Sequence, residues 1–132
     1  MVHKLTALVV DDNAINRLII GNLLKKYGAA VDEARNGQEA LLAVIERSFD
    51  IIFMDIQMPV MDGIESARRI RDLPKPKSST PIIAVTADAI QSHIERYRKE
   101  GFNDILVKPI NFDKIHDSIK LYQRPVSRQL CL

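Results

Sequence analysis

The chain has 132 residues, a length that suits one domain with a buried core of its own. It is 46% hydrophobic and 27% charged, and its net charge of +2 excludes bulk electrostatic attraction to nucleic acid or membranes. The single cysteine, Cys131, excludes a disulfide framework, and no apolar run approaches the length of a membrane helix. A cytoplasmic domain without membrane or nucleic-acid contacts is therefore expected.

The first half of the chain alternates short apolar runs with longer amphipathic segments. Ala7–Val10 is predicted to be a buried strand, and Asn13 is predicted to cap a helix that ends at Tyr27-Gly28. Ala29–Ala34 is a weaker strand whose acidic residues favour the edge of a sheet, and Asn36-Gly37 leads into a second helix. The apolar residues at helical spacing are Ile15, Leu18, Ile19 and Leu23 in the first helix, and Ala40, Leu41, Val44 and Ile45 in the second.

The second half of the chain repeats the alternation. A proline- and serine-rich segment in it is predicted to be a loop, and a glycine at position 101 ends a polar helix. In chain order we expect strand Asp50–Asp55, helix Ile64–Leu73, loop Pro74–Pro81, strand Ile82–Thr86, a helix that runs to about Lys99, strand Asp104–Lys108 and helix Phe112–Tyr122.

Five strands that alternate with five helices predict an α/β fold with a doubly wound parallel sheet. Parallel neighbours need crossover connections, and these are right-handed. We expect the flavodoxin-like strand order 2-1-3-4-5, which places ligands at the carboxyl ends of the strands near the switch between the first and third. The domain is predicted to span residues 1–122, with 123–132 as a tail or linker.

Polar residues stand at the carboxyl end of every central strand: Asp11, Asp12, Asp55, Thr86 and Lys108. Three carboxylates in one place repel one another unless a cation lies between them, and oxygen ligands of this kind suit Mg²⁺. A lysine supplies a compact positive charge, and a threonine hydroxyl can donate to an incoming oxygen. Each residue alone is an ordinary cap or surface residue, but together they predict a site that places a phosphoryl group on a carboxylate with metal assistance.

Four segments resemble the receiver domain of two-component response regulators. They are "VVDDN" (Val9–Asn13), "MDIQMPVMDG" (Met54–Gly63), "AVTA" (Ala84–Ala87) and "VKPI" (Val107–Ile110). They occur in the order and at the spacing of that family, and the resemblance runs from Leu5 to Tyr122.

The resemblance implies a role for each residue of the site. Asp55 would be the phosphoacceptor, and its donor would be a histidine on a histidine kinase or a histidine phosphotransfer protein. Asp55 would also share a Mg²⁺ ion with Asp12 directly, with Asp11 mainly through water, and with the backbone carbonyl of Gln57.

The same resemblance assigns the remaining positions. Lys108 would contact the phosphoryl group, with a cis bond expected between it and Pro109, and Thr86 would move toward the phosphoryl group once it is in place. Gln57 and Asp88 would flank the site and set the rate at which the phosphoryl group is hydrolysed.

The chain departs from the family at Ile105, where receivers usually carry an aromatic residue that moves together with the threonine. An isoleucine has no ring to exchange between exposed and buried states, so this coupling is in question. The resemblance also implies a surface for dimers or output partners, formed by the fourth helix, fifth strand and fifth helix. That surface would include Tyr97, Ile105 and Phe112.

Three other functions are compatible with parts of this pattern. A haloacid-dehalogenase-type phosphatase would need a second acid two residues after the nucleophile, where this chain has Gln57. A flavodoxin-like cofactor carrier would bind its phosphate where Asp11 and Asp12 would repel it. A degenerate receiver that acts only as a protein-interaction module is opposed by the intact site, although Ile105 favours it.

The expected function is therefore a phosphoacceptor switch and not an enzyme with a separate substrate. "VDDNAINRLI" and "GFNDILVKPI" are most similar to receivers attached to hybrid histidine kinases, which pass phosphate to a histidine phosphotransfer partner. A stand-alone receiver and one that forms part of a larger protein both remain open.

Overall fold

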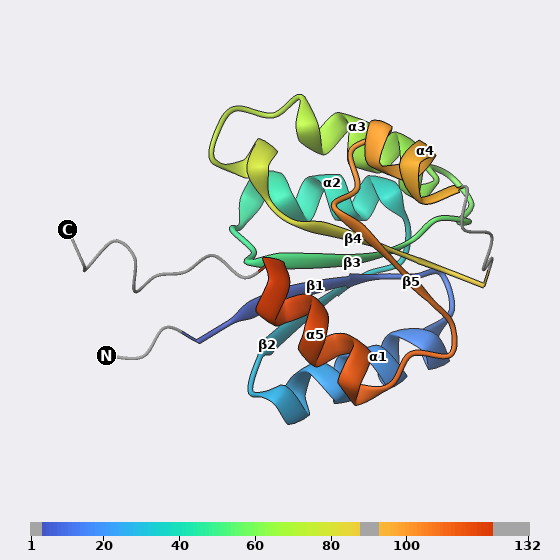
Figure 1. Ribbon diagram of the computed structural model, residues 1–132. Helices are drawn as coiled ribbons and strands as arrows, with labels where there is room; N and C mark the ends of the chain where they lie inside the picture. Colours follow the sequence, from blue (N-terminus) through green and yellow to red (C-terminus); the bar gives the residue numbers. More distant parts are fainter. Residues whose placement is uncertain (1–3, 88–92, 123–132) are drawn as a thin grey trace.

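A computed structural model of the chain describes residues 4–87 and 93–122 (Figure 1). It contains one five-stranded parallel sheet of order β2-β1-β3-β4-β5, so the predicted fold class and strand order are confirmed. The elements are β1 (Thr6–Val10), α1 (Ala14–Tyr27), β2 (Ala30–Ala34), α2 (Gly37–Glu46), β3 (Ile51–Asp55), α3 (Gly63–Arg71), the 3-10 turn η1 (Lys77–Ser79), β4 (Ile82–Thr86), α4 (His93–Lys99), β5 (Asp104–Val107) and α5 (Phe112–Tyr122).

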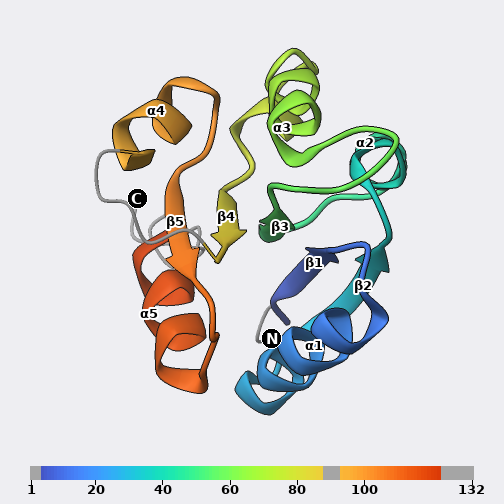
Figure 2. The ribbon, with the colours of Figure 1, turned by 90° about the vertical axis from the view of Figure 1, so that its right-hand side faces the viewer.

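Helices cover both faces of the sheet, as Figure 2 shows from the side of the carboxyl ends of the strands. Helices α1 and α5 lie on one face, and α2, α3 and α4 lie on the other. Successive side chains of a strand point to opposite faces, so Ala7 and Val9 of β1 belong to the α1 and α5 core, whereas Leu8 and Val10 belong to the other. This two-sided burial explains why the strands read as continuous apolar runs.

The helices begin where the sequence places capping residues. The Asn13 side chain accepts hydrogen bonds from the backbone N–H groups of Ile15 and Asn16, at 2.9 and 3.1 Å. Asn36 caps α2 in the same way, and Gly28 ends α1 with a φ of 108°, a conformation that favours glycine.

None of the helices in the described ranges has both the length and the apolar composition needed to cross a bilayer.

Of the predicted apolar stripe of α1, only Leu23 packs against the core, and the other three residues face solvent. Ile15, Leu18 and Ile19 are 67%, 59% and 48% exposed, while Ile20 and Leu24 make the buried contacts. Apolar residues surround most of this helix, so spacing alone could not tell the stripe that packs on the sheet from the one that faces solvent. A smaller difference lies in the predicted loop between β4 and α3, which contains the short turn η1.

The loop between β3 and α3 passes very close to the end of β3. A Cβ atom on Gly63 would lie 2.4 Å from the backbone oxygen of Asp55, so only glycine allows this approach. Earlier in the same loop, Val60 has a φ of 71°, and Met61 donates its N–H to the carbonyl of Pro59 at 2.9 Å. A β-branched residue rarely adopts a positive φ, so this tight turn is strained.

Candidate functional site

Strand register places two acids side by side at the carboxyl edge of the sheet. Val10 of β1 pairs with Met54 of β3, and the next residue of each strand is Asp11 and Asp55 respectively. The ends of both strands face the viewer in Figure 2. Neighbouring parallel strands lie about 4.8 Å apart, so the two carboxylates meet across the gap.

Asp11 is almost completely buried, with 1% of its surface exposed. Its Oδ1 accepts a hydrogen bond from the N–H of Asn13 at 2.9 Å. Its Oδ2 is buried and has no hydrogen-bond partner among the described residues; the nearest cation is the Lys108 Nζ at 3.7 Å. An unpaired buried carboxylate oxygen is costly, which makes this atom the clearest sign of an absent ligand.

Asp55 is also buried, with 8% of its surface exposed. Its Oδ1 accepts a hydrogen bond from the N–H of Gln57 at 3.2 Å, and its Oδ2 lies 4.0 Å from the Lys108 Nζ. Burial raises the pKa of Asp55, the nearby charge of Asp11 raises it further, and Lys108 acts in the opposite direction. Folding therefore disfavours the ionised form of Asp55, and a further positive charge beside it would favour that form.

Asp11, Asp12 and Asp55 form a cluster that could hold a metal ion. One carboxylate oxygen from each lies within 4.8 Å of the others, and Asp12 is the exposed member. Hard oxygen donors, two of them buried and one of those without a partner, fit a small divalent cation such as Mg²⁺. A cation here would relieve both the repulsion between the acids and the unpaired Asp11 Oδ2.

The other predicted residues are distributed around this cluster. Thr86 ends β4 and is half-buried, and Gln57 is exposed beyond the end of β3. The Lys108–Pro109 bond is cis, which is the isomer expected. Asp88 lies outside the described residues.

The predicted partner surface around α4, β5 and α5 is only partly continuous. Tyr97 and Ile105 are partly buried and pack against the core on the α2, α3 and α4 side. The ring of Phe112 instead stacks on His116 and lies 5.2 Å from the Lys26 Nζ of α1. Phe112 therefore lies on the α1 side of the molecule, and its inclusion in that surface was wrong.

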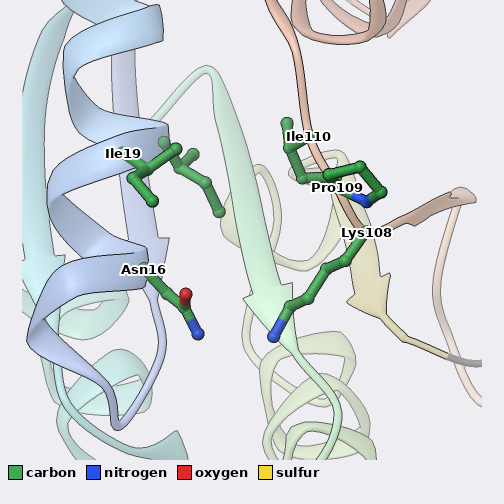
Figure 3. Close-up of a pocket in the computed structure, with 6 residues that line it drawn as sticks. Asn16, Ile19, Lys108, Pro109 and Ile110 are labelled. Carbon is green, nitrogen blue, oxygen red and sulfur yellow. The ribbon is translucent and has the colours of Figure 1, made fainter.

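A pocket of about 550 Å³ adjoins the site between α1 and the segment after β5. Asn16, Ile19 and Ile20 line it from α1, and Lys108, Pro109 and Ile110 line it from the other side. In Figure 3 the Asn16 amide and the Lys108 ammonium point toward each other across this space. The pocket thus lies between Ile19, one of the exposed apolar residues of α1, and Lys108, the cation beside the acidic cluster.

Sequence reasoning missed Arg17, which also contacts the site. Its side chain is 13% exposed, and its Nη1 donates to the backbone carbonyl of Asp11 at 2.8 Å. In sequence this arginine is one of 19 basic residues, on a helix with much exposed surface, and nothing in the pattern distinguishes it. Only the path of the chain between β1 and α1 brings it to Asp11.

Comparison with known proteins agrees with this geometry. Residues 7–120 match the family model described as the response regulator receiver domain. The chain is 40% identical over 115 residues to the autoinducer 2 sensor kinase/phosphatase LuxQ of Vibrio vulnificus, which covers 87% of this chain and 13% of that protein. The chain therefore spans only a small part of this relative.

Two solved structures are similar over nearly the whole chain. The receiver domain of sensor histidine kinase PA1611 from Pseudomonas aeruginosa, with magnesium coordinated in its active site cleft, is 31% identical with a TM-score of 0.82, covering 91% of this chain and 98% of that one. The receiver domain in the co-crystal structure of Saccharomyces cerevisiae Ssk1 with the histidine phosphotransfer protein Ypd1 is 36% identical with a TM-score of 0.83, covering 91% and 89%. The resemblance to receivers carried by histidine kinases is confirmed.

Proposed function

Because the chain belongs to the family of response regulator receiver domains, we propose that it accepts a phosphoryl group on Asp55 from a phosphohistidine, in a Mg²⁺-dependent reaction. The observation that carries this proposal is the arrangement of Asp55, Asp11 and Lys108 at the carboxyl edge of the sheet. It supplies a nucleophile, a metal ligand and a cation within reach of one another. Phosphoryl transfer needs mainly such positioning and charge neutralisation.

Each residue has a definite part in the transfer. A carboxylate oxygen of Asp55 would form the new bond to phosphorus while the bond from phosphorus to the donor imidazole nitrogen breaks. Lys108 would stabilise the phosphoryl oxygens, and Thr86 would donate its hydroxyl to one of them. Burial of Asp55 and its rigid place at a strand end keep the nucleophile aligned and partly dehydrated.

Mg²⁺ would be held by carboxylate oxygens of Asp11, Asp12 and Asp55 and by the backbone carbonyl of Gln57. When bound, the ion supplies positive charge that neutralises both the acids and the transferred group. Since the chain acts on its own side chain, we expect no turnover of a separate substrate. The phosphorylated domain would act as a switch through Thr86, with Gln57 and Asp88 setting its lifetime.

The α1 surface is the proposed docking site for the phosphohistidine donor. The exposed Ile15, Leu18 and Ile19 form an apolar patch on a helix beside the pocket that leads to Lys108. The related Ssk1 receiver forms a complex with a histidine phosphotransfer protein, which supports a partner of this kind. Apolar patches next to a polar reaction site are typical of protein interfaces.

We further propose that the chain is the receiver of a hybrid histidine kinase. Its similarity to a much longer sensor kinase and to the receiver of a sensor histidine kinase supports this parent. Dimerisation through α4, β5 and α5 is a secondary proposal, now based on Tyr97 and Ile105 without Phe112.

The test is phosphorylation of the isolated chain by acetyl phosphate with Mg²⁺, followed by intact-mass measurement. Wild type should gain one phosphoryl group, and Asp55→Asn should gain none. Asp62→Asn is a matched control, because Asp62 is an exposed acid in the adjoining loop whose capping role asparagine can also fill. Equal labelling of wild type and Asp55→Asn would disprove the assignment of Asp55, and labelling that persists when Mg²⁺ is chelated would disprove the dependence on Mg²⁺.

A further inference from the structure

We infer that Arg17 is a positioning residue for the metal-binding acids, a role that rests on the proposed Mg²⁺-dependent function. Arg17 lies in the first turn of α1 and keeps only 13% of its side chain exposed. An arginine this buried has exchanged most of its hydration for specific contacts. Those contacts lead directly to the segment that carries Asp11 and Asp12.

The guanidinium of Arg17 joins the ends of β1 and β2. Its Nη1 donates to the backbone carbonyl of Asp11 at 2.8 Å, and its Nε donates to the Glu33 Oε1 at 2.9 Å. Glu33 is the next-to-last residue of β2, and the last residue, Ala34, accepts the N–H of Asp11 at 3.1 Å. Glu33 thus holds Arg17 in the orientation that meets the Asp11 carbonyl.

Fixing the Asp11 carbonyl also fixes where Asp12 begins. The peptide group is planar, so the carbonyl of Asp11 and the N–H of Asp12 share one plane. With the Asp11 side chain held by the N–H of Asn13, both the plane and the first carboxylate have a defined orientation. Asp12 is exposed, so the backbone sets the position from which its side chain reaches a bound ion, while rotation about its own bonds sets where the carboxylate points.

Electrostatics alone and a positioning role predict opposite changes in Mg²⁺ affinity when Arg17 is removed. A positive charge beside a cation site repels Mg²⁺, so its loss should strengthen binding if charge were all that mattered. A positioning role instead predicts weaker binding, because removal of groups that orient metal ligands typically costs about tenfold or more in affinity. The direction of the change therefore separates the two explanations.

The experiment measures Mg²⁺ affinity by calorimetric titration, without any phosphoryl donor. We expect Arg17→Met to weaken Mg²⁺ binding about tenfold, and Arg17→Lys, which keeps the charge but cannot make both hydrogen bonds, to give an intermediate loss. Arg47→Met is the matched control, because Arg47 pairs with Asp32 of β2 at 2.7 Å yet is 50% exposed. It removes the same charge and a comparable ion pair, and should leave the affinity within about twofold of wild type.

Three outcomes would overturn the inference: unchanged or tighter Mg²⁺ binding in Arg17→Met, the same loss in Arg47→Met, or wild-type affinity in Arg17→Lys. Circular dichroism before titration checks that each variant is folded, and if Arg17→Met is not, Arg17→Lys alone decides. A purely structural role would lower the unfolding temperature without changing the affinity of the folded protein. Wild type that binds Mg²⁺ but is not phosphorylated on Asp55 would contradict the proposed function and leave the role of Arg17 intact.

Discussion

The two ends of the sheet differ in how completely their buried charged groups are hydrogen-bonded. At the carboxyl edge, Asp11 and Asp55 are buried together, and the Asp11 Oδ2 has no hydrogen-bond partner in the described part of the chain. At the amino edge, the partly buried guanidinium of Arg71 reaches four uncharged acceptors, each at a normal hydrogen-bond distance. These are the carbonyls of Gly101, Ser78 and Thr80 at 2.9, 2.9 and 2.7 Å, and the Asn103 Oδ1 at 2.8 Å.

This difference separates stability from function. Burial lowers the pKa of Arg71, but the four acceptors compensate the lost hydration and join α3, the segment before β4 and the segment before β5. The acids at the other edge are compensated only in part by the described residues: Asp11 and Asp55 each accept one backbone N–H and share the Lys108 ammonium at 3.7 and 4.0 Å. A charge whose contacts are complete holds the fold together, whereas a charge whose contacts are incomplete is ready for a ligand.

The largest expected effect is therefore at the amino edge. Arg71→Met should lower the free energy of unfolding by about 3 kcal/mol, because it takes the donor from three part-buried backbone carbonyls at once. Chemical denaturation in urea measures this loss. The neighbouring Arg69→Met is the control, since Arg69 is 56% exposed and pairs along its own helix with Glu65, so its loss should be about 0.5 kcal/mol or less. Equal losses would remove the proposed contrast between the two edges.

At the carboxyl edge the expected effect has the opposite sign. The pKa of Asp55 is raised by folding, so between the ordinary carboxyl pKa and the raised value the unfolded chain has lost a proton that the folded chain keeps. Stability therefore falls as the pH rises through this interval. Asp55→Asn removes that penalty, and in Mg²⁺-free buffer it should be more stable than wild type at neutral pH.

The pH dependence of this gain is the sharper part of the test. The difference between Asp55→Asn and wild type should shrink as the pH falls through the same interval and be lost below about 4, where the carboxyl is protonated in both states. Added Mg²⁺ should stabilise wild type more than the variant, because the ion binds only the folded arrangement of acids. A variant that is less stable than wild type at neutral pH without Mg²⁺ would show that the acids are not in conflict.

The smallest effect concerns strain in the loop beside the site. Val60→Asn should stabilise the protein by about 0.5 kcal/mol, because asparagine adopts a positive φ more readily than a β-branched residue. Val60 is 84% exposed, so little packing is lost. Val60→Ala keeps a Cβ and should gain less; a larger gain from alanine than from asparagine would argue against backbone strain as the cause. Thermal unfolding of the three proteins distinguishes these results.

Local sequence patterns predicted the sheet and the residues at its carboxyl edge because both follow from short-range rules. Apolar runs specify strands, and parallel topology gathers their polar ends, which is why Asp11, Asp55 and Lys108 could be placed together. Ile15 on α1 could not be assigned correctly, because an apolar residue of a binding surface has the same spacing as one of a core. Phe112 was misplaced for a related reason: the side toward which its ring points depends on how α5 packs against α1.

The roles of Arg17 and Arg71 depend on longer-range geometry. Both are arginines on amphipathic helices, and in sequence they are indistinguishable from the exposed Arg69. Each acquires its role from backbone carbonyls contributed by other segments, which carry no sequence signal because every residue has one. Contacts of a side chain with backbone groups outside its own helix are thus the part of the structure that sequence patterns miss.

Because Val10 pairs with Met54, the acids of the site meet only when β1 and β3 are in the correct register. Side chains along a strand alternate between faces, so a slip of one residue between β1 and β3 would separate the two acids and also misalign both hydrophobic cores. An insertion or deletion of one residue within either strand would therefore disturb both the pairing of the acids and the packing of the cores. Length changes are therefore expected to be tolerated in the loops alone, and the proposed metal binding would report whether the two central strands have found their proper alignment.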